Sequence, residues 1–406
     1  MIEDLEEAKN LLLLGVDLPA LAHSARRAGY NVYAVDYFGD MDLRSACVEC
    51  LSTIRQEPGR TCGRFSSDFD PEGLVDRAKR LVEKVDVDGV LLSSGLDDEY
   101  DLLCRVESEV APIIGNKPET FRAVRDRRNF FQELRRLGIP HPETFVVEEV
   151  SEAESAAKGL GFPVLVKPAK GFAGVGVRRV DNVSELRSAF REVQTVSEKV
   201  VVQQYVEGIH ASVSVMASRW GVAVLTVNEQ LLGMAEVGQR EPFGYCGNVV
   251  PLEGYETVLG ECAAVAEKLC RRFGLLGSNG IDVVLSDGKP YVVEVNPRFQ
   301  ATLECVERLL GVNLVEAHVK ACTSGELPEV GEPSGFCTRL ILYARRRVAV
   351  PDLTCFGCVR DVPYPGVLVE AGEPICSVVV FGEDRSSSLE AALKMTEKVY
   401  GILREA

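Results

Sequence analysis

The stretch IDVVLSDGKPYVVEVNPR, residues 281–298, decides the fold prediction for this chain of 406 residues. Asp287-Gly288 lies between two runs rich in β-branched residues, which is a strong signal for a β-hairpin turn. If the pairing is symmetric about Gly288, Asp282 lies directly opposite Glu294. Because side chains alternate between the faces of a strand, Asp282, Glu294 and Asn296 share one face. The other face is expected to be apolar and to carry Ile281, Val283, Leu285, Tyr291, Val293 and Val295.

The acidic face of this hairpin predicts a metal site. Two facing carboxylates cost free energy unless a cation lies between them. Asp282, Glu294 and Asn296 offer the hard oxygen ligands that Mg²⁺ (or Mn²⁺) prefers, and Arg298 follows as a partner for phosphate oxygens. The alternative is a hairpin with one solvated acidic face. Glu294 interrupts a run that otherwise reads as buried on both faces, which favours a carboxylate with a partner.

Composition limits the classes of function. The chain is 46% apolar and 26% charged, as expected for a globular enzyme of two to four domains. A formal charge of −16 argues against a nucleic-acid binder, so any phosphate ligand must be held locally. No apolar run is long enough for a membrane span. The acidic start, residues 1–7, does not resemble a secretory signal, and we expect a cytoplasmic protein.

Thirteen cysteines are too few for a disulfide scaffold in a chain of this length. Most of them fall in apolar helical patterns and are expected to be small buried residues. Two Cys-x-x-Cys pairs, Cys47/Cys50 and Cys355/Cys358, could together hold zinc. They lie far apart in the chain, and coincidental spacing is the favoured interpretation.

The N-terminal part predicts a parallel sheet. Residues 10–15, 31–36 and 89–92 read as strands with a helical pattern after the first, which gives a β-α-β opening. The fingerprint of dinucleotide-binding folds is missing. The polar loop 93–98, with Ser94 and Asp97, follows the third strand. Ligands bind at the carboxyl ends of such strands, so this loop is a candidate for the substrate side.

Two basic segments follow. Residues 118–137 predict one helix that begins at Pro118 and carries six arginines, either as a solvated face or as the wall of an anion site. Residues 161–177 then place Lys167 at the end of a strand, before a loop with Gly171, Gly174 and Gly176. Such glycines allow backbone N–H groups to approach phosphates closely, although a plain hairpin turn is the commoner outcome.

The remaining segments complete the pattern. Residues 200–208 predict a strand with a polar end, and His210 begins the next, amphipathic strand. Residues 244–248 read as a glycine-flanked loop and 253–273 as a helix. After the hairpin come Gln300 and Glu304, then a strand that carries Arg339. Arg339 is expected either to hold a substrate carboxylate or to form a structural ion pair.

Four of these motifs, in this order, resemble the ATP-grasp superfamily, and most closely its ligases related to biotin carboxylase. They are Asp126-Arg127, Lys167 with its three glycines, Gln203-Gln204-Tyr205-Val206, and Asp282 with Glu294-x-Asn296-x-Arg298. The resemblance covers residues 10–325. It implies an α/β fold with an N-terminal parallel-sheet domain, a small α+β lid and a C-terminal antiparallel-sheet domain. The implied divisions are 1–115, 116–206 (lid, with the basic helix), 207–330 (metal site) and 331–406 (an extension packing on the core).

The resemblance also assigns roles. Arg127, Lys167 and the loop Gly171, Gly174 and Gly176 would contact the phosphates of ATP. Gln203, Gln204, Tyr205, Val206 and His210 would hold adenine and ribose. Asp282, Glu294 and Asn296 would bind Mg²⁺, and Arg298 with Lys167 would be catalytic. Ser94, Asp97, Gln300 and Arg339 are the substrate candidates. Gln203 and Arg127 replace a Glu and a Lys that are frequent in the family, and both keep their hydrogen-bonding or charge capacity.

The implied activity is an ADP-forming carboxylate–amine ligase that works through an acyl phosphate. A small carboxylate and an amine acceptor would be its substrates, and a homodimer is compatible with the family. A carboxylase that activates bicarbonate is the second hypothesis, and it rests on Gln300 and Glu304. A catalytically idle ATP sensor is the third, and the intact Asp/Glu/Asn set argues against it.

Overall fold

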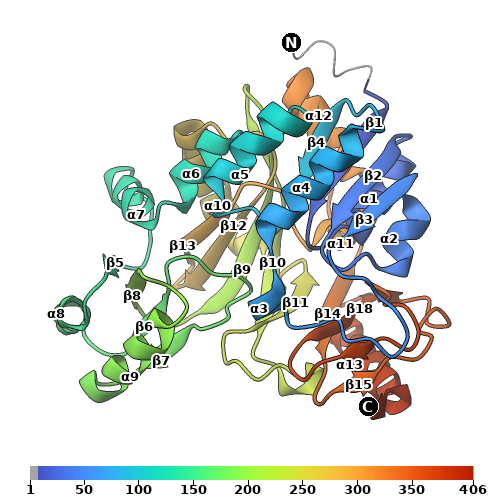
Figure 1. Ribbon diagram of the computed structural model, residues 1–406. Coiled ribbons are helices and arrows are strands. Elements are labelled where there is room, and N and C mark those ends of the chain that lie inside the picture. The colour runs from blue at the N-terminus through green and yellow to red at the C-terminus, as the bar shows by residue number, and fades with distance from the viewer. Residues whose placement is uncertain (1–7, 406) are drawn as a thin grey trace.

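The computed structural model describes residues 8–405, in which the strands form four sheets (Figure 1). Residues 1–7, on which the expectation about a secretory signal rests, lie outside this described part. Among residues 8–405, no helix combines the length and apolar character needed to cross a membrane.

The N-terminal sheet is parallel, as predicted. Leu11–Leu14 are fully buried in one of its inner strands, so both faces of the sheet are covered. Its strands, in order, are β3 (Glu49–Ser52), β2 (Asn31–Asp36), β1 (Asn10–Gly15) and β4 (Gly89–Leu92). The helices of this region are α1 (Pro19–Arg27), α2 (Met41–Ala46), α3 (Phe65–Asp68), α4 (Pro71–Val82), α5 (Tyr100–Arg105) and the π-helical turn η2 (Val106–Val110).

An eight-stranded sheet forms the centre of the molecule, and its strand pairs are antiparallel. Its order is β13 (Lys289–Asn296), β12 (Gly277–Ser286), β9 (Ile209–Ala217), β10 (Val222–Leu232), β11 (Tyr245–Val250), β14 (Phe336–Tyr343), β18 (Pro374–Gly382) and β16 (Val359–Arg360). The accompanying helices are η3 (Ala235–Val237), α10 (Glu256–Phe273), α11 (Leu303–Leu310), α12 (Leu314–Thr323) and α13 (Arg385–Ile402). A continuous apolar core of α1, α11 and α12 joins this sheet to β1.

A small lobe stands apart from these two sheets, at the lower left of Figure 1. It consists of β5 (Thr144–Val147), β8 (Val200–Gln204), β6 (Val164–Pro168) and β7 (Arg178–Val180), covered by α8 (Val150–Leu160) and α9 (Val183–Gln194). The lobe has its own apolar core. A short sheet of β17 (Leu368–Val369), β15 (Val348–Ala349) and β19 (Arg404–Glu405) lies near the C-terminus.

The predicted hairpin is β12–β13, and Asp282 does pair with Glu294. The route to this pairing differs from the prediction. The turn has two residues, Asp287 and Gly288, and the register then shifts by one between Asp282 and Val283. Such a bulge moves the following side chains to the opposite face. The predicted apolar face is therefore wrong for Tyr291 and Val293, because Val292 joins Val295 in the core.

Two other predicted elements are corrected. Residues 118–137 form two helices, α6 (Pro118–Arg125) and α7 (Arg127–Arg136), since Asp126 leaves the helical conformation and caps α7 by accepting from the Asn129 backbone N–H. Residues 244–248 are not a loop, because Tyr245 begins β11. Gly247 supplies the close approach to β14, where a Cβ atom would lie 1.9 Å from the Arg339 carbonyl oxygen.

The structure bears on two of the expected domain divisions. Helices α6 and α7 were expected in the lid. Their buried residues Val124, Phe130 and Leu134 instead pack into the core of the eight-stranded sheet, because their apolar face meets α10 and β13. Residues 331–406 were expected to form an extension that packs on the core. Their strands extend the central sheet itself, because β14 pairs with β11 and β18 pairs with β14.

Candidate functional site

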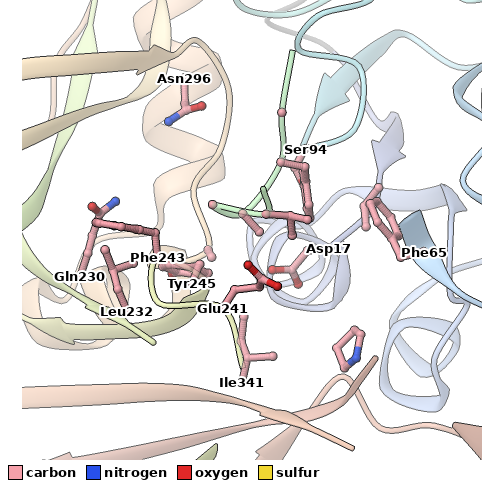
Figure 2. A pocket seen from close by; sticks show the side chains of 18 of the residues that line it. Asp17, Phe65, Ser94, Gln230, Leu232, Glu241, Phe243, Tyr245, Asn296 and Ile341 are labelled. Atoms are coloured by element: carbon pink, nitrogen blue, oxygen red, sulfur yellow. The ribbon is translucent and has the colours of Figure 1, made fainter. Parts of the chain in front are cut away.

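A cavity of about 930 Å³ lies where the small lobe, the N-terminal sheet and the central sheet meet. In Figure 2, Asp17, Phe65 and Ser94 face Tyr245 and Ile341 across this space. Among the predicted site residues, Gly176 does not line the cavity. Those that do are Ser94, Asp97, Arg127, Lys167, Gly171, Gly174, Gln203, Gln204, Tyr205, Val206, His210, Asp282, Glu294, Asn296, Arg298, Gln300 and Arg339.

Asp282 and Asn296 lie side by side toward the open end of the hairpin, away from its turn. The Asn296 amide donates to Asp282 Oδ2 at 3.0 Å, and Gln230 donates to Asp282 Oδ1 at 3.0 Å. Both donors are neutral amides. Burial raises the pKa of Asp282, although Arg298 opposes this. A carboxylate in such surroundings is stabilised by a cation that approaches from the cavity.

Glu294 is held by two arginines. It forms an ion pair with Arg125 and accepts from Arg127 Nη2 at 2.9 Å. Arg125 also forms a bidentate pair with Asp98, with both nitrogen–oxygen distances at 2.8 Å. Sequence reasoning placed Arg125 in a basic helix and missed it as a site residue, as it missed Asp98. The break at Asp126 is what turns Arg125 and Arg127 toward the same carboxylate.

Lys167, which is half-buried, and Arg127, which is buried, are cations whose charge is only partly balanced. Lys167 donates to the neutral Gln203 Oε1 at 2.9 Å, and Gln203 is oriented by Thr144. Burial, with Arg127 and Arg125 adding repulsion, lowers the pKa of Lys167 to about 7. Burial and Arg125 likewise lower the pKa of Arg127 to about 9, and Arg127 Nη1 has no hydrogen-bond partner. These groups are arranged to receive an anion.

The segment that joins the small lobe to the central sheet forms one side of the cavity. Gln204 ends β8, and Tyr205 follows with the Arg179 guanidinium 4.7 Å from its ring centre. His210 lies in β9 opposite the Phe243 ring, and burial together with Lys167 lowers its pKa. Exposed backbone groups beside apolar and aromatic side chains suit a flat heterocycle.

The glycine-rich segment 169–177, here named the lid loop, lies over the cavity. Tyr245 N–H donates to the Ala173 carbonyl at 3.0 Å, and Lys170 pairs with Glu99 at 3.1 Å. Gly174 has a φ of +74°, and a Cβ there would lie 1.9 Å from the Phe243 carbonyl oxygen, so only glycine fits. Phe172 contacts the Phe65 ring with centroids 5.0 Å apart. The loop is thus held on both sides of the cavity.

Arg298 lies between the hairpin and the N-terminal sheet. Its Nε donates to Asp97 at 2.9 Å, and its Nη2 to Asn296 Oδ1 at 3.4 Å. Although burial acts in the other direction, Arg298 and Arg125 hold the pKa of Asp97 below its ordinary value. Arg298 also acts electrostatically on both Asp282 and Asp17. It therefore connects two regions of the cavity.

Arg339 and Asp17 line a second region of the cavity. Arg339 Nη2 pairs with Asp17 at 3.0 Å and with Asp361 at 2.9 Å, which is the ion-pair alternative of the sequence analysis. Asp17 is placed by β1 and β4: Ser93 donates to its carbonyl at 3.1 Å. Gln300 is turned toward the backbone and donates to the Arg298 carbonyl at 2.6 Å. Asp17 belongs to residues 15–17, which end the first predicted strand and were expected to contribute to the substrate pocket, whereas Asp361 carries no sequence motif that marks it as a site residue.

The cysteine pairs do not form a zinc site. In residues 8–405, no three His, Cys, Asp or Glu side chains come together in an arrangement that could hold a metal. All thirteen cysteines are free thiols. The candidate magnesium ligands differ in kind, because two carboxylates and one amide make up that set.

Comparison with known proteins agrees with this geometry. Residues 124–302 match the ATP-grasp domain family. A relative in Methanocaldococcus jannaschii, itself uncharacterized, is 24% identical over 91% of this chain and 87% of its own length. The mitochondrial arginine-specific carbamoyl phosphate synthase large chain of Schizosaccharomyces pombe is 24% identical over 94% of this chain. This chain spans only 34% of that synthase.

Solved structures show the same fold over the whole chain. The biotin carboxylase of Campylobacter jejuni, solved as a β,γ-ATP complex, superposes with a TM-score of 0.72, at 17% identity, over 98% of this chain and 92% of its own. The L-amino acid ligase of Bacillus licheniformis superposes with a TM-score of 0.70, at 18% identity, over 98% of both chains. The fold expected from the sequence motifs is confirmed.

Proposed function

We propose that this chain, in which residues 124–302 match the ATP-grasp domain family, joins a carboxylate to an amine and forms ADP. The observation that carries this proposal is that one cavity holds cations whose charge is incompletely balanced and a carboxylate that is hydrogen-bonded only to neutral amides. Arg127 is buried and Lys167 half-buried, and neither is fully compensated, whereas Asp282 is a half-buried carboxylate with neutral donors. ATP with Mg²⁺ would satisfy both kinds of group.

Different residues of the cavity would bind different parts of Mg·ATP. Lys167 and Arg127 would bind phosphate oxygens, and the Gln203–Val206 segment with His210 would bind the base and ribose. Asp282 and Asn296 would hold the metal, joined by Glu294 once Arg125 and Arg127 turn toward phosphate. Mg²⁺ bound there would neutralise charge on the transferred phosphoryl group. Phosphoryl transfer depends mainly on such positioning and charge neutralisation.

The proposed reaction has two steps. A carboxylate oxygen of the donor forms a bond to the γ-phosphorus, the bond to the bridging oxygen breaks, and ADP leaves. The amine nitrogen then forms a C–N bond to the acyl carbon, the C–O bond to phosphate breaks, and phosphate and a proton are released. Arg298 lies where it would stabilise the acyl phosphate. The lid loop would exclude water, which otherwise hydrolyses that intermediate.

The carboxylase alternative receives less support. It rests on Gln300 and Glu304. Glu304 pairs with Arg360 at 2.8 Å and Arg308 at 2.8 Å and is not among the residues that line the cavity. Gln300 is bonded to backbone carbonyls.

ADP release tests the proposal. The protein is incubated with Mg·ATP and pooled carboxylates and amines, with bicarbonate, or with neither. We expect ADP only in the first case, lost in Glu294→Ala and retained in Glu304→Ala. ADP release that requires bicarbonate and is lost in Glu304→Ala would favour the carboxylase. A Glu294→Ala variant with full activity would contradict the metal assignment.

A further inference from the structure

The cavity continues beyond Arg298 into a region that the nucleotide does not need. We name it the acceptor end and define it by the cavity-lining residues Asp17, Tyr37, Asp40, Phe65, Phe69, Phe172, Arg339, Asp361 and Glu373. Figure 2 shows Asp17 and Phe65 on one side of this space and Ile341 below it. Its lining differs from that of the phosphate region in both charge and polarity.

One wall of the acceptor end is aromatic. Phe65 is the centre of this wall, with ring centroids 4.7 Å from Phe69, 5.0 Å from Tyr37 and 5.0 Å from Phe172. Phe172 comes from the lid loop, so the wall is complete only when this loop covers the cavity. Its ring remains 41% exposed. Aromatic faces of this kind receive apolar bodies and favour cations close to them.

The acceptor end also carries an excess of carboxylates. Asp17 and Asp361 share the single guanidinium of Arg339. Asp40 accepts from the neutral Gln56 amide at 2.7 Å, and Glu373 accepts from the Phe65 backbone N–H at 2.9 Å. Burial raises the pKa of Asp17 to about 6 in spite of Arg339, and it raises the pKa of Asp40 and Glu373 as well. A cationic ligand would relieve this cost.

Two buried polar atoms here also lack partners. Arg339 is 4% exposed, and its Nε has no hydrogen bond. Tyr37 is 1% exposed, and its hydroxyl group has none either. Buried polar groups in folded proteins are nearly always paired, so these two atoms are unusual.

We infer that the acceptor end binds the amine substrate as an ammonium group held by Asp17, with a large apolar or aromatic body against Phe65, Phe69 and Phe172. Asp17 would take one ammonium proton before the nitrogen forms the C–N bond, because an ammonium nitrogen has no free electron pair. This inference rests on the proposed ligase function and names the class of its acceptor. Acidic amines are disfavoured by the carboxylates, and small amines leave the aromatic wall without contacts. Asp17, Arg298 and Asp282 line the same cavity, so the ammonium would share one space with the phosphoryl-transfer region.

Calorimetry with simple probes tests this inference. 2-Phenylethylamine carries both features, 3-phenylpropionate reverses the charge, 2-phenylethanol removes it, and ethylamine lacks the ring. We expect 2-phenylethylamine to bind at least about tenfold more tightly than the other three, since a charged hydrogen bond and a buried ring each contribute at that level. Asp17→Asn should weaken the binding of 2-phenylethylamine about tenfold and leave 2-phenylethanol unaffected.

Mg·ATP binding is measured on the same samples and separates the two proposals. If Mg·ATP binds and 3-phenylpropionate or ethylamine binds as tightly as 2-phenylethylamine, the inference about the acceptor is wrong and the ligase proposal stands. If Mg·ATP does not bind, the ligase proposal itself fails. If Asp17→Asn does not fold, the affinities of the four probes for the unchanged protein still test the inference. Phe65→Leu is then the variant to use, and it is expected to reduce the preference for 2-phenylethylamine over ethylamine.

Discussion

The two ends of the cavity have opposite charge requirements. At the nucleotide end, defined by Arg125, Arg127, Lys167, Asp282, Glu294 and Asn296, two cations have incomplete compensation and one carboxylate has only amide donors. At the acceptor end, two of the four carboxylates, Asp17 and Asp361, share one arginine near an aromatic wall. We therefore expect each end to disfavour the ligand of the other by charge, although both ligands would share one continuous space.

Arg298 and the lid loop connect the two ends of the cavity. Arg298 acts electrostatically on both Asp282 and Asp17, and both of these carboxylates act on Tyr245. The lid loop reaches both ends as well, through Gly174 near Phe243 and through Phe172 on Phe65. A reaction with an intermediate that passes from phosphate to amine requires this kind of shared boundary.

Asp282→Asn should have the largest effect. The substitution keeps the shape and can still accept one of the two hydrogen bonds from Asn296 and Gln230, but it removes the charge that would hold the metal. We expect ADP formation to fall by about 100- to 1000-fold, the cost of removing one electrostatic group from a preorganised site. Asp287→Asn, in the exposed turn of the same hairpin, is the matched control and should keep full activity. Equal activity of both variants would contradict the assignment of the nucleotide end.

Lys167→Met should weaken nucleotide binding by about 10- to 100-fold, because charge-assisted hydrogen bonds to phosphate are among the stronger ones. Binding of 2-phenylethylamine at the acceptor end should stay within about twofold. Lys199→Met, on the exposed surface of the small lobe, is the control, and equilibrium dialysis is the measurement. A parallel loss of both ligands would show that the ends are not independent.

The pH dependence of nucleotide binding sharpens the same contrast. With the pKa of Lys167 lowered to about 7, the free protein carries a neutral amine above that pH, whereas bound phosphate favours the protonated form. Affinity should therefore fall as pH rises above about 7, with uptake of up to about one proton per ATP near pH 8. Calorimetry in two buffers of different ionisation enthalpy measures the uptake. Lys167→Arg should abolish it, and unchanged uptake in that variant would point to another group.

Phe172→Ala should have the smallest effect. An aromatic pair contributes about 0.5–1.5 kcal/mol beyond burial, so affinity for 2-phenylethylamine should fall about two- to tenfold. Mg·ATP affinity should change by less than about twofold, because Phe172 contacts Phe65 rather than the cationic residues. Val175→Ala changes a second exposed apolar residue of the lid loop and should leave both affinities unchanged. A larger effect on ATP than on the amine would reverse the assignment of this wall.

The sequence was sufficient for the nucleotide end because its residues lie in local motifs. Asp282 and Glu294 were correctly paired. A symmetric hairpin gives the same pairing as the observed two-residue turn followed by a bulge, so the sequence pattern did not distinguish between the two. Arg125 was missed because one continuous helix was expected. Asp126 with Asn129 three residues later is a capping signal that could have indicated the break.

The acceptor end could not be predicted in the same way. Asp17 and Arg339 are 322 positions apart, and the contact between them depends on how the N-terminal sheet packs on β14. Phe65 and Phe172 likewise come from different parts of the fold. Contacts between residues so far apart in the chain leave no spacing pattern in the sequence. They follow from the shared core of α1, α11 and α12 that fixes the two sheets relative to each other.

Equilibrium dialysis of ATP against the folded protein, with and without Mg²⁺, tests the central claim most directly. The account predicts that one ATP binds per chain, that binding requires the divalent cation, and that Asp282→Asn removes this requirement together with most of the affinity. Well-folded protein that binds no ATP in the presence of Mg²⁺ would contradict the account.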